Sequence, residues 1–259
     1  MNNFQAIIAI AARDVTKLFR DKTRIVFSFM FPFIFIGILG QSLQSNLSSS
    51  LGFNLLLFTF LGVMAQTFFQ STASGVISLV TDRENDFAQE MFVAPISRWA
   101  IIAGKIIGES TVSFIMTVSI IALGIVLQIP ADWPRLLAIL PVGFLICILG
   151  GSFGVLIMSN LSGVQSAQQI FPFVLFPQFF LAGVFNPITH LPPMLFVLSR
   201  IAPMTYAVDL FRGLYYAGKP EYSKVVLHSP LVNLAIIGGI IFVLLIVGTA
   251  IFVAREKNR

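Results

Sequence analysis

Long apolar stretches separated by short polar segments run through the whole chain. A helix needs about 20 mainly apolar residues to cross the bilayer core, and six stretches are interpreted as such spans, although the fifth is short. They are residues 25–43, 53–80, 101–127, 136–158, 170–184 and 231–254. The pattern predicts an all-α integral membrane protein with six transmembrane helices, folded as a single transmembrane domain over residues 1–259.

Residues 1–22 have the spacing of an amphipathic helix. The apolar face is formed by Phe4, Ile7, Ile8, Ala11, Val15 and Leu18. Arg13, Lys17 and Arg20 lie on another face, followed by Arg24. The pattern predicts an interfacial helix with its apolar side in the membrane and its cations toward anionic lipid. The alternative is a soluble helix that packs on a partner protein.

Prolines predict irregular helices in two parts of the chain. Pro32 predicts a kink in the first span, which neighbouring helices can tolerate. Residues 186–222 are too apolar for a free loop and too interrupted by proline for a span. We expect two short helices there that re-enter the outer leaflet, with non-helical backbone shielded by protein.

A polar stripe follows one face of the second span. Thr67, Ser71 and Ser74 belong to it, and such a face turns away from lipid, toward other helices or a substrate path. Phe176 and Phe180 of the aromatic fifth span are further candidates for that path. Contact with lipid, or core packing, is the alternative for these aromatic residues.

Residues 82–98 interrupt the apolar pattern with charge. In a helix, Asp82, Asp86 and Glu90 form an acidic stripe beside an apolar seam. Such a helix is a docking element for a partner, whereas the alternative is a solvated loop. The candidate docking residues are Asp82, Glu84, Asp86, Phe87, Glu90, Met91 and Pro95.

Two spacings inside the spans predict specific contacts. Lys105 and Glu109 are four positions apart, so we expect an ion pair; the alternatives are that they separate at the interface or that Glu109 faces a cavity. Gly150 and Gly154 form a small-xxx-small step. This step predicts close helix packing, within the subunit or across a dimer.

Composition supports the membrane assignment and excludes other classes. The chain is 57% hydrophobic and only 10% charged, compared with about 25% charged in soluble domains. Its single cysteine and two separated histidines predict neither disulfides nor a metal site. The net charge of +5 does not indicate nucleic-acid binding, because placing both termini in the cytoplasm puts eleven of the 16 basic residues on the inner side.

Three motifs carry a resemblance to a known family. They are EMFVAPISRWAIIAGK at 90–105, FFLAGVFNPITHLPP at 179–193 and APMTYAVDLFRG at 202–213. Together with the order of the spans, they resemble the type-2 permease subunits of ATP-binding-cassette exporters over essentially the whole chain. Members often have Gly-Thr-Leu-Glu where this chain has residues 86–89, DFAQ.

The resemblance implies a non-enzymatic permease that forms a homodimer and docks on two cytoplasmic ATP-binding subunits. Docking would use residues 82–98, which we call the coupling segment, and the basic N-terminal helix. The chain has no GxxxxGK[ST] phosphate loop, so ATP and Mg²⁺ are expected on the partner and no cofactor on this chain.

The expected location is the plasma membrane of a prokaryote, with both termini cytoplasmic. The expected cargo is drug-like or lipid-like and leaves the cytoplasm or the inner leaflet. The alternatives are a lipid-linked glycan as cargo, and a membrane anchor without transport activity. An ion-coupled transporter is disfavoured, because ionisable residues are nearly absent from the spans.

Overall fold

A computed structural model of the protein describes residues 2–45, 52–84, 97–161, 163–188 and 191–257. These residues contain helices and no strand. The helices are α1 (Asn3–Arg20), α2 (Lys22–Pro32), the π-helix η1 (Phe33–Gly40), α4 (Leu55–Ile77), α5 (Leu79–Glu84), α7 (Arg98–Val126), α8 (Trp133–Ile139), α9 (Val142–Asn160), α10 (Val164–Leu181), α11 (Pro193–Ile201), α12 (Pro203–Tyr216), α13 (Tyr222–Val225) and α14 (Pro230–Lys257).

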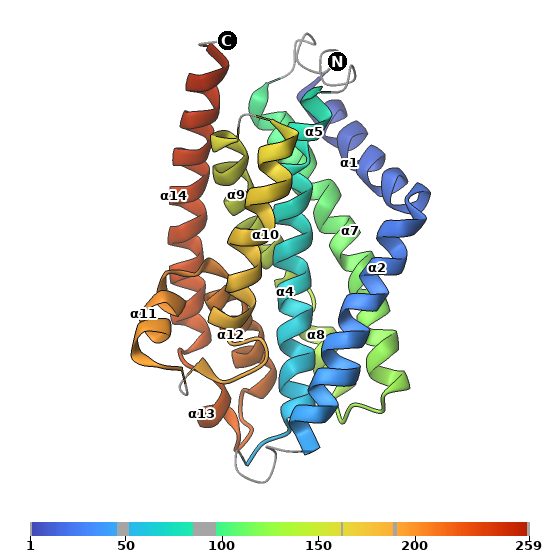
Figure 1. Ribbon diagram of the computed structural model, residues 1–259, viewed down its shortest axis with the longest axis vertical. Helices are drawn as coiled ribbons and strands as arrows, with labels where there is room; N and C mark the ends of the chain where they lie inside the picture. The colour runs from blue at the N-terminus through green and yellow to red at the C-terminus, as the bar shows by residue number, and fades with distance from the viewer. Residues whose placement is uncertain (1, 46–51, 85–96, 162, 189–190, 258–259) are drawn as a thin grey trace.

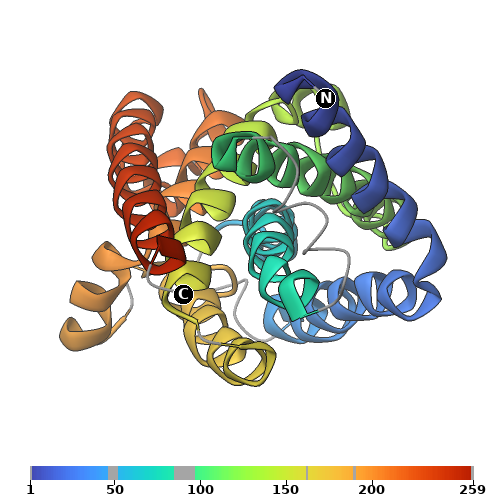
Figure 2. The same ribbon diagram turned by 90° about the horizontal axis from the view of Figure 1, so that it is seen from above.

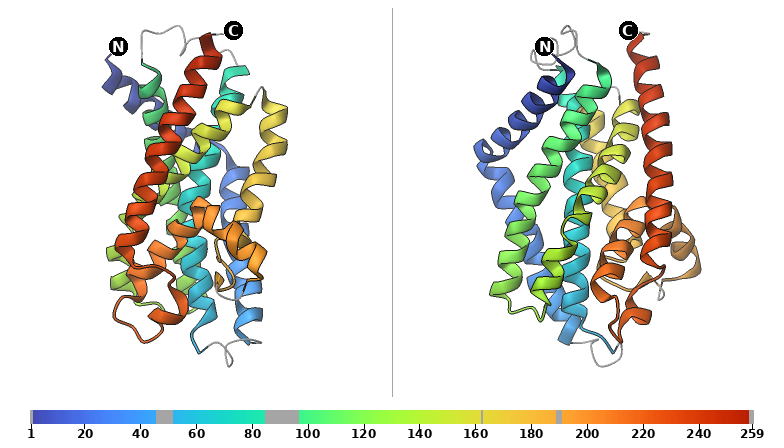
Figure 3. Two further views of the ribbon diagram at one scale, coloured as in Figure 1. Left: turned by 90° about the vertical axis from the view of Figure 1, so that its left-hand side faces the viewer. Right: turned by 180° about the vertical axis from the view of Figure 1, so that it is seen from behind.

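The long helices form one bundle around α4. Seen from above in Figure 2, α4 lies in the middle with α2, α7, α9 and α10 around it. Most residues of α4 are buried, whereas few residues of the spans that contain α2 and α14 are buried. Helix α1 begins and α14 ends at one end of the bundle, the termini end, and α11, α12 and α13 lie toward the opposite end (Figures 1 and 3).

The number of described helices that could cross a membrane is five to six, close to the six predicted. Five of the described helices are long and apolar enough to cross a membrane, and the bent pair of α11 and α12 raises the number to six at most. The two helices of this pair meet at 87°, which is the geometry of a broken span or a re-entrant segment. Two short helices are therefore present where residues 186–222 predict them.

The predicted fifth span differs most from the structure. Helix α10 starts at Val164, six residues earlier than expected, and carries Pro172 and Pro177 in its interior. Its first turns contain Gln165, Gln168 and Gln169, and these amides lower its hydropathy, so α10 is not among the helices that pass as spans. The polar start lies at the termini end of the bundle (Figure 1).

Pro32 changes the winding of the first span rather than ending it. Helix α2 ends at Pro32 and continues directly as η1, which keeps π-type winding over 8 residues. Proline has no N–H to donate to the preceding turn, and π-type segments accommodate such interruptions. The expected irregularity is present at this residue.

Glycines on α9 allow it to approach α4 closely. A Cβ at Gly150 would lie 2.2 Å from the carbonyl oxygen of Phe69, and one at Gly154 would lie 2.7 Å from that of Ala73. Both contacts are with the backbone of α4. The small-xxx-small step therefore packs within the subunit, which answers the choice left open by the sequence.

We predict that Gly150→Ala lowers the free energy of unfolding by about 1–3 kcal/mol, because the new methyl group forces α4 and α9 apart. Thermal unfolding of the purified protein in detergent measures the change. Gly238→Ala on α14 is the matched control, since nothing lies within 4 Å of that position. Equal unfolding temperatures for the two variants would contradict the packing argument.

Candidate functional site

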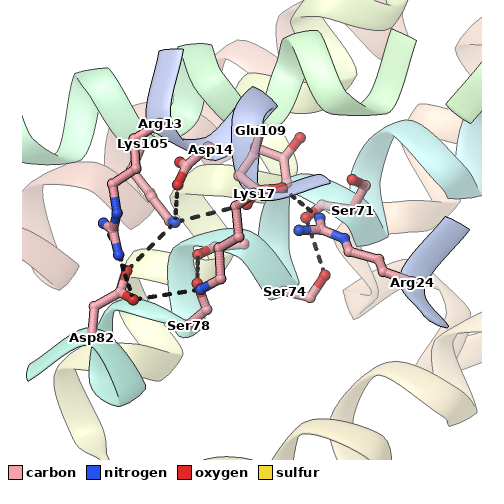
Figure 4. Close-up of polar contacts among 12 residues, drawn as sticks. Arg13, Asp14, Lys17, Arg24, Ser71, Ser74, Ser78, Asp82, Lys105 and Glu109 are labelled. Carbon is pink, nitrogen blue, oxygen red and sulfur yellow. Dashed lines mark hydrogen bonds and ion pairs between the residues drawn. The ribbon is translucent and has the colours of Figure 1, made fainter. Parts of the chain in front are cut away.

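Seven charged side chains meet near the termini end of the bundle, and we call them the ion-pair cluster. Helices α1 and α2 supply the residues before position 25, α5 supplies one carboxylate, and α7 supplies a lysine and a glutamate (Figure 4). The members are Arg13, Asp14, Lys17, Arg24, Asp82, Lys105 and Glu109. Their carboxylate, guanidinium and ammonium groups hold together three segments that are far apart in sequence.

Lys105 is the centre of the cluster. Its side chain is 1% exposed, and its Nζ atom lies 2.8 Å from Oδ1 of Asp14, 3.7 Å from Oε1 of Glu109 and 3.8 Å from Oδ2 of Asp82. The predicted Lys105–Glu109 pair is present, but Asp14 makes the shortest contact. The surrounding carboxylates compensate the buried ammonium for the solvation that it loses on burial.

Asp82 points into this cluster rather than away from the protein. Its carboxylate accepts two hydrogen bonds from Arg13, at 2.9 and 3.3 Å, and lies 3.6 Å from Nζ of Lys17. Burial acts to raise the pKa of Asp82, but Lys105, Arg13 and Lys17 outweigh it and hold that pKa below its ordinary value. The first residue of the predicted acidic stripe is thus bound inside the chain, and a direct contact with a partner remains a prediction.

Asp14 has the opposite electrostatic balance. Burial raises the pKa of its carboxyl above the ordinary value, against the opposing effect of Lys105. Its second oxygen, Oδ2, makes no hydrogen bond to any described residue. Asp14 therefore depends on Lys105 more than the other two acids do.

Glu109 links the cluster to the start of the first span. Oε2 of Glu109 lies 2.8 Å from Nη2 of Arg24 on α2. The glutamate packs against Gly75 of α4, where an added Cβ would lie 2.1 Å from its side-chain carbons. Glycine at position 75 is therefore required for this approach.

Helix α1 reaches the cluster because α7 carries two glycines. A Cβ at Gly108 would lie 2.9 Å from the Cα atom of Ala11, and one at Gly104 would lie 3.1 Å from that of Ile7. The α1 face that is buried against the protein is formed by Ala6, Ile10, Asp14 and Leu18.

This buried face differs from the predicted apolar face of α1. Of the residues expected on that face, Leu18 is buried, whereas Phe4 and Ile8 are more than half exposed. Arg20 is exposed in the last turn. The exposed apolar and basic groups leave the interfacial orientation of α1 as a prediction.

A cavity of about 290 Å³ lies between α2 and α4, next to the cluster. Thr67, Ser71 and Ser74, the three candidates on the second span, line it together. The other lining residues are Arg24, Phe27, Ser28, Phe31, Pro32, Gln66, Gln70 and Met116. Arg24 therefore belongs both to the cavity wall and to the ion-pair cluster.

Phe176 and Phe180 do not line this cavity. Both are about half exposed on α10, where their rings pack against each other with centroids 5.8 Å apart. Phe176 also contacts Phe179, which in turn contacts Phe31 of the cavity wall at 5.8 Å. These two candidates are thus adjacent to the cavity only through intervening aromatic rings.

Most of the predicted docking residues lie outside the described part of the chain. These residues are Asp86, Phe87, Glu90, Met91 and Pro95. Glu84 ends α5. The docking roles of Glu84 and of these five residues stay predictions.

A second buried charge, Arg212 on α12, holds the re-entrant segment at the opposite end. The guanidinium donates to the carbonyl oxygens of Gly183, Val184 and Phe58 at 2.8, 2.9 and 2.9 Å, and lies 3.3 Å from the centre of the Phe58 ring. The side chain of Arg212 is only 3% exposed. It is a fixed internal group.

Asp209, one turn earlier on α12, holds the chain that follows. Its carboxylate accepts hydrogen bonds from the backbone N–H groups of Leu227 and His228 at 2.8 and 2.9 Å. It also accepts from Nδ2 of Asn233, at 2.8 Å. Asp209 and Arg212 together join α12 to α4, to the end of α10 and to the start of α14.

Sequence reasoning missed Asp14 and Arg212, although each had a signal. Asp14 falls at steps of four with Ala6, Ile10 and Leu18, so it shares their face in a helix. Gly104 and Gly108 form a GxxxG step around Lys105, which indicates a closely packed partner helix. For Arg212, the signal is an arginine within an apolar helical segment.

Comparison with known proteins places this geometry in a family. The sequence matches the family described as "ABC-2 type transporter" over residues 5–216. This chain belongs to the ABC-2 type transporter family. The match includes the ion-pair cluster, the cavity and Arg212.

Two relatives agree with that assignment. The chain is 26% identical over 221 residues to a putative transport permease, ycf38, of Cyanophora paradoxa, covering 82% of this chain and 74% of the relative. It is 29% identical over 142 residues to the probable multidrug ABC transporter permease YbhR of Escherichia coli, covering 54% of this chain but only 38% of YbhR. This ABC-2 protein is thus a multi-pass transport permease, the membrane component of an ABC transporter.

Proposed function

We propose that this permease exports amphipathic or hydrophobic molecules, drug-like or lipid-like, out of the cytoplasm or the inner leaflet. The observation that carries the proposal is the cavity between α2 and α4. Hydroxyl and amide groups of α4 form one wall, and aromatic and aliphatic groups form the other. Such a lining suits a molecule with a polar head and an apolar body. The description of YbhR as a probable multidrug permease supports this class of cargo.

The energy source in this proposal is ATP hydrolysed on a separate cytoplasmic subunit. A partial GxxxxGK match runs from Gly213 to Lys219, but Pro220 follows where Ser or Thr is needed to bind Mg²⁺. Its first residues belong to α12, whereas a phosphate loop connects a strand to a helix. Two copies of the ATPase would bind a permease homodimer in the plasma membrane of a prokaryote, on the side that carries both termini.

The ion-pair cluster supplies a physical link between the ATPase and the cavity. The coupling segment begins at Asp82, whose carboxylate is bound to α1 and α7, and Arg24 connects the same cluster to the cavity wall. ATP can shift the permease between states only if contacts differ in those states. We place these contacts at the coupling segment.

The ATPase activity of the permease with its candidate partner in lipid vesicles tests the proposal. The panel contains amphipathic drugs and a lipid-linked glycan. Stimulation by the drugs is expected, and stimulation by the glycan alone would favour the alternative cargo. If no partner forms a complex with the permease and none gives stimulation, the membrane anchor without transport activity is favoured. Transport driven by a proton gradient without ATP would contradict ATP-driven export.

We predict that the double charge reversal Asp86→Arg and Glu90→Arg reduces co-purification of the ATPase about tenfold, because complementary charge at an interface is lost. Membrane insertion and folded yield are expected to stay unchanged. Glu221→Arg, at the opposite end of the bundle, is the control for a charge reversal away from this segment. Undiminished co-purification of the double variant would count against docking through this segment.

A further inference from the structure

The polar wall of the cavity offers hydrogen-bond acceptors at the middle of α4. Gln66 is equally far from both ends of this helix and is 1% exposed. Its Nε2 atom donates to Oε1 of Gln70 at 3.1 Å, whereas its own Oε1 atom accepts no hydrogen bond from any described residue. A buried amide oxygen without a donor is costly in a membrane protein, so this oxygen indicates a binding partner in the cavity.

Two neighbouring hydroxyl groups, those of Thr67 and Ser74, have already committed their protons. Oγ1 of Thr67 donates to the carbonyl oxygen of Val63 at 2.8 Å, and Oγ of Ser74 donates to that of Gln70 at 2.8 Å. A hydroxyl that donates to its own helix keeps acceptor capacity on its oxygen. These oxygens, with Oε1 of Gln66, offer acceptors to a ligand that donates hydrogen bonds.

The charge around the cavity disfavours an ionic head group. Among the lining residues, Arg24 carries the one formal charge, and Glu109 neutralises it at 2.8 Å. No unpaired lining charge thus compensates an ammonium or a carboxylate, and transfer of an ion from water into such a site costs several kcal/mol. An uncharged donor avoids this cost.

We infer that this cavity binds amphipathic molecules whose head is uncharged and donates hydrogen bonds through O–H or N–H groups, with Oε1 of Gln66 as the principal acceptor. The apolar body lies toward Phe27, Phe31 and Pro32 of α2. The volume of about 290 Å³ is at the lower end of the range for small-molecule sites, about 300–1,000 Å³, which fits a single ring system. The inference rests on the proposed export of amphipathic molecules and names the head group that the site selects.

The test uses two probes that differ in one donor, indole and N-methylindole. Cys147, the single cysteine of the sequence, is replaced by alanine, and Ser71→Cys places a thiol in the cavity wall. The rate at which N-ethylmaleimide labels this thiol is measured on the permease in lipid nanodiscs at increasing probe concentrations. Indole is expected to protect the thiol at about tenfold lower concentration than N-methylindole, as the loss of one buried hydrogen bond implies.

Two controls make the result specific to Gln66. Gln66→Met keeps the volume but removes the acceptor, and is expected to abolish the difference between the probes. Ser119→Cys reports on the neighbouring cavity on the other side of α2, lined by apolar groups such as Val26 and Leu123, where the two probes are expected to act alike. If Gln66→Met does not fold, the comparison of indole with N-methylindole on the protein that keeps Gln66 still tests the inference.

Three outcomes would overturn the inference. They are equal protection by indole and N-methylindole, stronger protection by the charged analogues tryptamine or indole-acetate, and no protection by any probe, which would leave water as the occupant. The assay requires no ATPase. Selective protection by indole in a permease that no amphiphile stimulates in vesicles would therefore contradict the proposed export while supporting the binding site.

Discussion

Lys105→Met is expected to lower the free energy of unfolding of the permease by about 3–5 kcal/mol, the cost of breaking a buried ion pair from one side. Methionine fills a similar space but carries no charge. Asp82 and Glu109 keep their arginine partners at 2.9 and 2.8 Å. Asp14 loses its 2.8 Å contact and is left as a buried carboxylate without compensation. Thermal unfolding in detergent, with folded yield from size-exclusion chromatography, measures the loss.

A second substitution tests whether the stranded carboxylate is the cause. Asp14→Leu in the Lys105→Met background removes the uncompensated charge and is expected to recover most of the stability, since apolar replacements of a whole buried pair are often neutral. Lys17→Met is the control, because its half-exposed ammonium lies 3.6 Å from Asp82 and such pairs contribute at most about 1 kcal/mol. A Lys105→Met variant as stable as Lys17→Met would show that the cluster does not hold α1 on α7.

The same variants separate stability from coupling. If the cluster links the coupling segment to the cavity, the rescued double variant is folded but lacks the charge that joins Asp82 to α7. Its ATPase partner is then expected to bind but to respond less to amphiphiles. This separation is possible because the stabilising contact of Lys105 goes to Asp14, whereas the coupling segment begins at Asp82.

Local patterns predicted the features that depend on neighbouring residues along one helix. The apolar stretches correspond to the helices of the bundle. The spacing of Lys105 and Glu109 corresponds to an ion pair at 3.7 Å, and Gly150 lies at a close contact between two helices. A period of 3.6 residues carries this information, because it determines which side chains share a face. The candidates Thr67, Ser71 and Ser74 meet at one cavity for the same reason.

The remaining contacts join residues that no local pattern relates. Asp14 and Lys105 are 91 positions apart, Arg24 and Glu109 are 85 apart, and Arg212 and Phe58 are 154 apart. A single sequence shows that each charge is unusual in its surroundings, but the partner depends on how the helices pack. Asp82 illustrates the point, because its spacing with Asp86 indicates an outward stripe, whereas packing turns its carboxylate inward.

Arg212→Leu is expected to lower the unfolding temperature markedly, with a loss of at least about 3 kcal/mol. The substitution leaves the buried carbonyl oxygens of Gly183 and Val184 without their donors, and each such group costs about 1–3 kcal/mol. The contact with the Phe58 ring is lost as well. Thermal unfolding in detergent reports the change, and proteolysis of the folded protein shows whether the segment after α10 becomes accessible first.

Arg212→Lys distinguishes the geometry of the guanidinium from its charge. Lysine keeps the positive charge but has one nitrogen, whereas the planar fork of arginine reaches three carbonyl oxygens at once. We expect Arg212→Lys to lose nearly as much stability as Arg212→Leu. A Lys variant close to the parent would mean that charge alone holds the segment.

Lys219→Leu is the control at the same end of the bundle. Lys219 is half-buried, and its ammonium lies 4.3 Å from the centre of the Tyr215 ring, a contact that contributes about 0.5–2 kcal/mol. If Arg212→Leu unfolds at the same temperature as Lys219→Leu, the carbonyl contacts of Arg212 do not hold the re-entrant segment. The binding of Asp209 to the backbone of Leu227 and His228 would then be the principal link between α12 and its surroundings.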